Sequence, residues 1–205
     1  MFNGVIDLSH HNAVADWAAV RRAGIAAVIH KATEGATFRD PEFRKRREAA
    51  RAAGLLWGSY HFSSGVEVGS QVDNYLAYAD PRPDELVCLD WEESTAGADM
   101  SLAQAEDFVE QVERRIGRAP VVYGGRRLRE ALGVTTASPL ARCPLWYARF
   151  ADAPRGVPAL WPRWTFWQYT DGASGPEPRT VDGLGPVDRD LFSGTEAELR
   201  AGWPF

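Results

Sequence analysis

Short apolar runs, rich in β-branched and aromatic residues, recur along the whole chain and predict strands. There are eight of them, at residues 3–9, 26–32, 55–62, 85–91, 120–123, 144–150, 165–169 and 186–192. Helical periodicity follows each of the first five, at residues 16–23, 41–53, 66–78, 101–116 and 126–132. The helix expected at 101–116 has the clearest ends, with Ser101 and Gln104 forming a capping box and Gly117 as the stop.

The last third of the chain has strands without helices. Residues 151–163 and 171–185 are rich in proline and glycine, and neither segment has helical periodicity. Alternating strands and helices favour a parallel sheet, and eight strands in one chain of 205 residues favour a closed α/β barrel. We expect a single domain over residues 1–205, because residues 195–205 are too short for a second module.

Composition and charge argue against several classes of function. The formal net charge of −5 argues against a nucleic-acid partner, because such binding depends on neutralising phosphates. No apolar run approaches about 18 residues, so no stable membrane association is expected. Residues 1–20 lack Lys and Arg, which argues against a secretory signal. Cys88 and Cys143 both sit in apolar surroundings, and we expect buried free thiols.

Each predicted strand carries polar or aromatic side chains near its end. In an α/β barrel the carboxyl ends of the strands form the active-site face. A buried carboxylate without a partner destabilises the folded state by several kcal/mol, so acids at these positions indicate a functional site. The residues in question are Asp7, Lys31, His61, Asp90 and Glu92, Tyr123, Tyr147, Gln168 and Tyr169, and Asp188.

Asp90 and Glu92 form the most informative pair. The run from Leu86 to Leu89 predicts a buried strand, and two acids at positions i and i+2 fall on one side of it. Their Cα atoms would lie roughly 6.6–6.8 Å apart. Neighbouring carboxyl groups push their pKa values apart, which leaves one protonated and one charged, as glycoside hydrolysis requires. Capping of the next helix is the competing interpretation.

Other chemistries have weaker support. His10 and His11 are adjacent, and the chain lacks H-x-H or H-E-x-x-H spacing, so no metal and no cofactor are expected. Lys31 could form a Schiff base, but an ion pair that holds the carboxylates together is the simpler role. Trp91, Trp146 and Trp167 could stack on sugars or simply fill the core.

Six segments in order and spacing carry a resemblance to a known family. They are Asp7-Leu8-Ser9-His10-His11-Asn12, Lys31-Ala32-Thr33-Glu34-Gly35, Tyr60-His61-Phe62, Leu89-Asp90-Trp91-Glu92, Leu145-Trp146-Tyr147-Ala148 and Trp167-Gln168-Tyr169. Over residues 3–194 the chain resembles the family-25 glycoside hydrolases, the Chalaropsis-type lysozymes. The resemblance implies an irregular TIM-like (β/α)5(β)3 barrel, which agrees with the missing late helices.

The resemblance also implies a reaction and a set of catalytic residues. The reaction is hydrolysis of the β-1,4 bond from N-acetylmuramic acid to N-acetylglucosamine in peptidoglycan, and the implied catalytic residues are Asp7, Asp90, Glu92 and Asp188. We expect Glu92 to be the general acid, and Asp90 to be the nucleophile or to orient the acetamido group of the substrate. Asp190 departs from the pattern, because the family usually has Asn at this position.

The remaining expectations concern binding and delivery. The substrate-binding candidates are Lys31, Tyr60, His61, Tyr123, Trp146, Tyr147, Trp167 and Gln168. We expect a monomer that acts on peptidoglycan glycan strands, without a separate wall-binding module. With no secretory signal expected, the protein would be made in the cytoplasm and reach the wall by phage lysis or a secretion machine. A non-catalytic glycan-binding barrel, a chitinase-like glycosidase and a Lys31 lyase remain alternatives.

Overall fold

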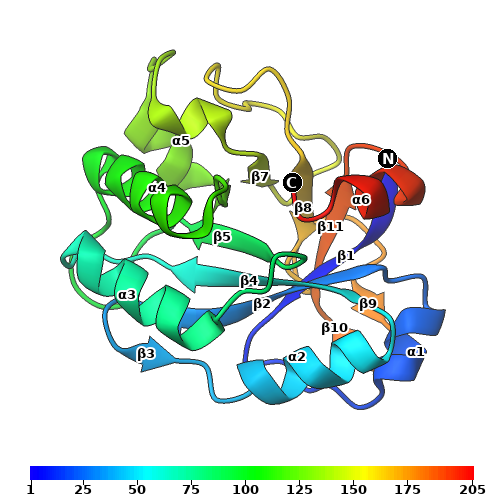
Figure 1. Ribbon diagram of the computed structural model, residues 1–205. Coiled ribbons are helices and arrows are strands. Elements are labelled where there is room, and N and C mark those ends of the chain that lie inside the picture. The colour runs from blue at the N-terminus through cyan, green and yellow to red at the C-terminus, as the bar shows by residue number, and fades with distance from the viewer.

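The computed structural model describes residues 1–205 and contains a closed barrel of eight strands (Figure 1). In chain order these are β1 (Phe2–Leu8), β2 (Ala27–Glu34), β4 (Leu56–Phe62), β5 (Leu86–Asp90), β6 (Val121–Gly124), β7 (Leu145–Ala148), β8 (Phe166–Thr170) and β11 (Asp188–Phe192). The strands from β1 to β8 run parallel, each beside the next, and β11 lies antiparallel between β8 and β1, closing the barrel. The predicted (β/α)5(β)3 architecture is therefore confirmed.

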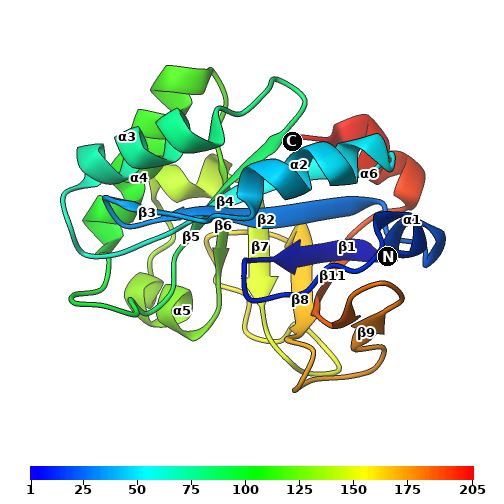
Figure 2. The ribbon, with the colours of Figure 1, turned by 90° about the horizontal axis from the view of Figure 1, so that it is seen from below.

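Five helices follow the first five barrel strands and pack on the outside. They are α1 (Trp17–Arg22), α2 (Phe43–Ala52), α3 (Val68–Ala79), α4 (Leu102–Ile116) and α5 (Arg126–Leu132). The predicted capping box of α4 is present, and Gly117 ends the helix in the left-handed region with φ of 77°. Figure 2 shows these helices beside the strands, whereas irregular segments cover β7 and β8. None of the helices combines the length and the apolarity needed to cross a membrane.

The alternation of side chains along each strand separates two apolar cores. Outward-facing residues such as Val87 and Leu89 pack against the helices in a cluster of 33 buried residues. Inward-facing residues such as Cys88 belong to a second cluster of 13 residues inside the barrel. The two cysteines are buried and unpaired, as expected, and Cys143 belongs to the outer cluster.

Several short elements were not predicted. Strand β3 (Phe38–Arg39) pairs with the end of β2, β9 (Thr180–Val181) pairs with β10 (Gly185–Pro186), and a 3-10 helix covers Pro139–Arg142. Such elements contain too few residues to show a period.

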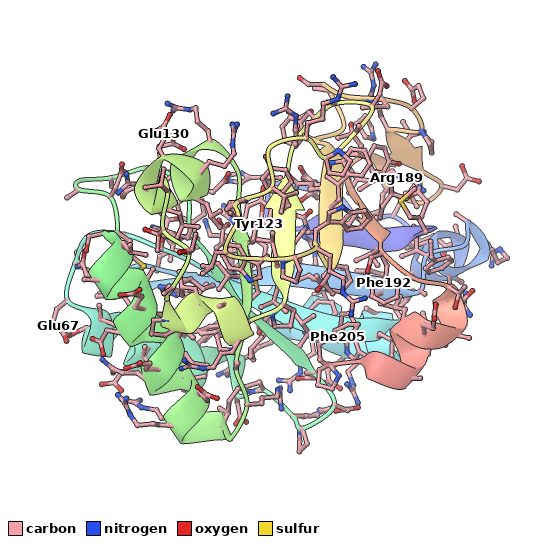
Figure 3. All side chains as sticks on the ribbon, turned by 90° about the horizontal axis from the view of Figure 1, so that it is seen from above. Glu67, Tyr123, Glu130, Arg189, Phe192 and Phe205 are labelled. Carbon is pink, nitrogen blue, oxygen red and sulfur yellow. The ribbon has the colours of Figure 1, made fainter.

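The chain ends in an unpredicted helix, α6 (Glu196–Gly202), which closes the barrel at the end opposite the carboxyl ends of the parallel strands. Thr195 and Glu198 cap the helix. Leu199 is its only buried residue, so the sequence has no apolar periodicity here that would predict a helix. After the helix, Phe205 returns to lie 5.6 Å from Phe192, measured between ring centroids (Figure 3).

Candidate active site

A cavity of about 290 Å³ opens at the carboxyl ends of the parallel strands. Nine of the predicted site residues line it: Asp7, Lys31, Tyr60, Asp90, Glu92, Tyr123, Trp146, Gln168 and Asp188. The other lining residues are Ser9, His11, Phe62 and Thr95. The structure therefore gathers all four predicted acids around one cavity, from three strands and the segment after β5.

The end of β5 explains how two neighbouring acids face the same cavity. Asp90 is the last residue of the strand and lines the cavity. Trp91 turns outward, is fully buried, and donates from Nε1 to the carbonyl of Met100 at 2.9 Å. Glu92 then faces the cavity again. Of the two roles considered for Trp91, filling the core is the one observed, and its ring fixes the turn that places the two acids.

Asp188 reaches the cavity by a different route from the one expected. The sequence placed it near the carboxyl end of a parallel strand, but it is the first residue of β11. Because β11 is antiparallel to β1, its beginning lies at the mouth of the cavity, where Asp188 is in register with Asp7. The reversed direction keeps an acid at the active-site face despite the reversed position in the strand.

Glu92 and Asp90 have different surroundings. Burial raises the pKa of Glu92 to about 7, with further contributions from the charges of Glu93 and Asp188. Burial also raises the pKa of Asp90 well above its usual value, and the charge of Glu92 adds to this, whereas the Lys31 ammonium opposes it. One oxygen of Asp90, Oδ1, is buried without a hydrogen-bond partner. Glu92 is thus suited to carry a proton, and Asp90 to accept a hydrogen bond from a ligand.

Asp7 is held in place by a chain of hydrogen bonds. Tyr123 donates from its hydroxyl to Gln168 Oε1 at 2.7 Å, and Gln168 Nε2 donates to Asp7 Oδ2 at 2.8 Å. Burial and the charge of Asp188 raise the pKa of Asp7, and the Gln168 bond partly offsets the rise. Burial also raises the pKa of Asp188 to about 6. Tyr123 lies near the centre of the molecule in Figure 3.

Contrary to expectation, Lys31 does not bridge the predicted catalytic acids. Its Nζ donates to Glu34 Oε2 at 2.5 Å, and Thr95 donates to the other oxygen of Glu34 at 2.5 Å. The ammonium also lies 4.7 Å from the centre of the Phe62 ring. Glu34 was not among the predicted site residues, although its i+3 spacing from Lys31 is visible in the sequence. Lys31 therefore influences Asp90 through its charge and not through a direct ion pair.

Three predicted substrate contacts lie outside the cavity. His61 is fully buried between Thr33 Oγ1 and Gln71 Oε1, with its ring nitrogens 2.8 and 3.2 Å from them. Tyr147 donates its hydroxyl to the carbonyls of the segment after β7, and Trp167 donates Nε1 to the carbonyl of Arg149 at 2.8 Å. The reason is the strand period: their neighbours Tyr60, Trp146 and Gln168 point inward, so these three point outward.

Asp190 is a further buried acid, and it has no predicted catalytic or binding role. It is fully buried two residues along β11 from Asp188, and its Oδ1 accepts a hydrogen bond from Trp146 Nε1 at 2.6 Å. Its Oδ2 has no partner. Burial raises its pKa well above the usual value, and the charge of Asp188 raises it further. Asp190 therefore supports the Trp146 wall of the cavity.

The histidines differ in their surroundings. His11 lines the cavity, whereas His10 is hydrogen-bonded through Nδ1 to Asp40 at 2.9 Å. No group of three or more His, Cys, Asp or Glu side chains is arranged to hold a metal ion.

Comparison with known proteins identifies the family. The model of "Glycosyl hydrolases family 25" matches residues 6–177. The chain is 32% identical to "Lysozyme M1" of Streptomyces globisporus, over 96% of this chain and 69% of that protein.

Similar solved structures support the same family assignment. The bacterial lysozyme of Streptomyces coelicolor is 31% identical, with a TM-score of 0.84 over 98% of this chain and 95% of that one. A muramidase from Trichobolus zukalii is 29% identical, with a TM-score of 0.83 over 98% of each chain. The chain therefore belongs to family 25 of the glycosyl hydrolases, enzymes that cleave glycosidic bonds.

Proposed function

We propose that this enzyme hydrolyses the β-1,4 bond from N-acetylmuramic acid to N-acetylglucosamine in peptidoglycan glycan strands. The observation that carries the proposal is the placement of a half-buried Glu92 and a buried Asp90 in one cavity at the end of β5. The names lysozyme and muramidase among its relatives support peptidoglycan as the substrate.

Glu92 is the general acid in this mechanism. Its raised pKa, about 7, keeps a proton available at mildly acidic pH. That proton passes to the glycosidic oxygen as the bond to C1 of muramic acid breaks, so N-acetylglucosamine leaves with a free 4-hydroxyl group. The resulting Glu92 carboxylate then takes a proton from the water that completes hydrolysis.

Asp90 stabilises the charge that develops at C1. Its unpartnered Oδ1 is suited to accept the N–H of the 2-acetamido group, whose carbonyl oxygen then attacks C1. Direct attack of the Asp90 carboxylate on C1 is the second route, and it would leave a covalent glycosyl–enzyme intermediate. Trapping that intermediate with a slow 2-fluoro substrate, followed by mass spectrometry of the intact protein, distinguishes the two routes.

The rest of the cavity is suited to holding sugars. Asp7 and Asp188 offer carboxylate oxygens to sugar hydroxyls, and Gln168 fixes Asp7 in place. The rings of Tyr60, Phe62 and Trp146 give the cavity apolar surface against which sugar faces can pack. The ion pair of Lys31 with Glu34 occupies the ammonium that a Schiff-base lyase would need.

Mass spectrometry of products from purified peptidoglycan, after borohydride reduction, tests the proposal. Reduced muramic acid at the new chain ends is the expected result. Reduced glucosamine ends, or cleavage of chitin oligosaccharides at an equal rate, would indicate a glucosaminidase or chitinase-like specificity. Binding without any new ends would indicate a non-catalytic glycan-binding barrel.

A further inference from the structure

A second cavity adjoins the active site and is lined by arginines. Its volume is about 340 Å³, and it shares Glu92 with the active-site cavity. Its other lining residues are Gly125, Arg126, Arg129, Ala148, Arg149 and Phe150, which we call the arginine pocket. The pocket lies between the start of α5 and the segment that follows β7.

Two of these arginines have no partner for their charge. Arg126 is paired with Glu93 and with Glu130, which lies on the outer part of α5 in Figure 3. Arg129 and Arg149 form no ion pair, and the Nε of each is buried without a hydrogen-bond partner. Two unpaired guanidinium groups beside the acid thus offer several free N–H donors.

The fold brings the arginines together through local packing. Gly125 allows α5 to approach the end of β7, because a Cβ at this position would lie 3.0 Å from the carbonyl oxygen of Ala148. Arg126 and Arg129 are three residues apart on α5 and share a face of the helix. Tyr147 donates its hydroxyl to the carbonyl of Gly156, which holds the following loop beside Arg129. The pocket is therefore built into the barrel.

The chemistry of the pocket selects an anionic group with an apolar part. Guanidinium groups bind carboxylates through paired hydrogen bonds. The Phe150 side chain is 42% exposed at the pocket and offers an apolar surface for a methyl group. The muramic acid of the proposed substrate carries a lactyl group whose methyl and carboxyl lie side by side. In intact peptidoglycan that carboxyl forms an amide with a peptide stem, which bears its own alanine methyl and free carboxylates.

We propose that the arginine pocket binds a carboxylate of the muramic acid side chain, through Arg129 and Arg149, while Glu92 acts on the adjoining bond. This inference rests on the proposed function, and it makes the pocket the feature that distinguishes muramyl glycans from chitin, which has no carboxylate. The carboxylate comes from the peptide stem in intact peptidoglycan, or from the lactyl group in glycan stripped of peptide.

Kinetics of the double variant Arg129→Met/Arg149→Met on three soluble glycans test this inference. The glycans are peptide-bearing strands, strands stripped of peptide by an amidase, and stripped strands whose lactyl carboxylates are methyl esters. We expect KM to rise about 10- to 100-fold on carboxylate-bearing strands, the loss typical of charge-assisted hydrogen bonds, and kcat to change little. The loss should be much smaller on the methyl ester. Arg163→Met is the matched control, because Arg163 is exposed, forms no ion pair and lies outside both cavities.

The pattern of losses identifies the source of the carboxylate. A loss confined to peptide-bearing strands assigns the pocket to the stem, and a loss confined to stripped strands assigns it to the lactyl group. An equal loss on all three glycans, or no loss on any, would overturn the inference. Thermal melting of each variant checks that the fold is intact.

Binding to Glu92→Gln enzyme separates this inference from the proposed function. Calorimetric titration with peptide-bearing strands should show weaker binding when Arg129 and Arg149 are also replaced. If the wild type releases no reducing muramic acid but this difference in binding is observed, the proposed function fails and the pocket assignment stands. If cleavage is observed and binding is unchanged, the pocket assignment fails alone.

Discussion

Individual side chains set the chemistry of this barrel, and the two acids at the end of β5 differ because their surroundings differ. Glu92 is half-buried and close to other carboxylates, whereas Asp90 is buried within reach of the Lys31 charge. Roles therefore follow from environment more than from residue type.

Substitution of the two acids should separate their roles. Glu92→Gln removes the proton and keeps the shape, so we expect a loss of at least about 100-fold in kcat/KM. The loss should shrink on a substrate with an activated phenol leaving group, which needs no proton. Asp90→Asn should not be rescued in this way, because stabilisation at C1 stays impaired. Steady-state kinetics on both substrates measure the difference, and rescue of Asp90→Asn alone would mean that the roles are reversed.

Lys31→Met should alter the pH profile and not the fold. The Lys31 charge lowers the pKa of Asp90, so its removal raises that pKa further. If Asp90 works as a carboxylate, the acidic limb of the kcat/KM profile should move to higher pH. On that limb, kcat/KM at a fixed pH should fall about tenfold for each unit by which the pKa of Asp90 rises. Lys45→Met, which removes the other lysine of the chain from an exposed site on α2, is the control. An unchanged profile would remove Lys31 from the acid network.

Asp190→Asn should stabilise the protein at neutral pH. Folding raises the pKa of Asp190 above its ordinary value of 3.8. Its favourable contribution to the free energy of unfolding is therefore complete below pH 3.8 and is lost as pH rises through the pKa of the folded state. Asn keeps an oxygen for Trp146 but does not titrate. The gain in Tm should therefore be present at pH 7 and vanish near pH 4. Melting curves across this range measure it, with exposed Asp107→Asn as control. A gain independent of pH would contradict this account.

At the scale of elements, strand β11 and helix α6 close the barrel in different ways. Strand β11 carries Asp188 and Asp190 into the barrel by running antiparallel to both neighbours. Helix α6 seals the opposite end, where Leu199 belongs to the same inner cluster as Phe166 and Phe192. The proposed catalytic acids and the helix that closes the barrel thus lie at opposite ends of the same strands.

Leu199→Ala should therefore reduce stability without changing catalysis directly. Removing a fully buried leucine side chain typically costs about 2–5 kcal/mol in the free energy of unfolding. Chemical denaturation measures this cost, and kcat of the folded variant should stay close to that of the wild type. Arg200→Ala, on the exposed side of the same helix, is the matched control and should cost below about 1 kcal/mol. A similar cost for both variants would show that α6 does not seal the barrel through Leu199.

At the scale of the whole molecule, one cavity collects acids from distant parts of the chain. Asp7, Asp90, Glu92 and Asp188 come from β1, the end of β5 and β11, and burial raises the pKa of every one of them. The common cause is closure of the barrel, which removes water from these groups together. The enzyme as a whole should consequently work best at acidic pH.

The alkaline limb of kcat/KM should lie near pH 7. Glu92 must be protonated to act, so the rate falls as pH rises through its pKa of about 7. Glu93→Gln should move this limb to lower pH, because the Glu93 charge helps to raise the pKa of Glu92. Glu130→Gln is the control, since Glu130 also pairs with Arg126 but its charge is not among those that raise the pKa of Glu92. If both variants shift the limb equally, the effect comes from Arg126 and not from Glu93.

The sequence by itself determined the order of the elements and the positions of the acids. Strand and helix periods, together with caps such as Ser101 and Gly117, depend on neighbours within a few residues, so they were visible in the chain. The same period two could have placed His61, Tyr147 and Trp167 outside the barrel, because each follows or precedes an inward-facing residue.

Only the tertiary structure decided which groups meet. The direction of β11 depends on how the barrel closes, and the bond from Tyr123 to Gln168 joins residues 45 positions apart. The ion pair of Lys31 with Glu34 depends on the geometry where β2 meets its neighbours. The unpaired state of Arg129 and Arg149 likewise depends on which carboxylates folding brings within reach. Such pairings follow from closure of the whole barrel, and apart from the i+3 spacing of Lys31 and Glu34 no local pattern indicates them.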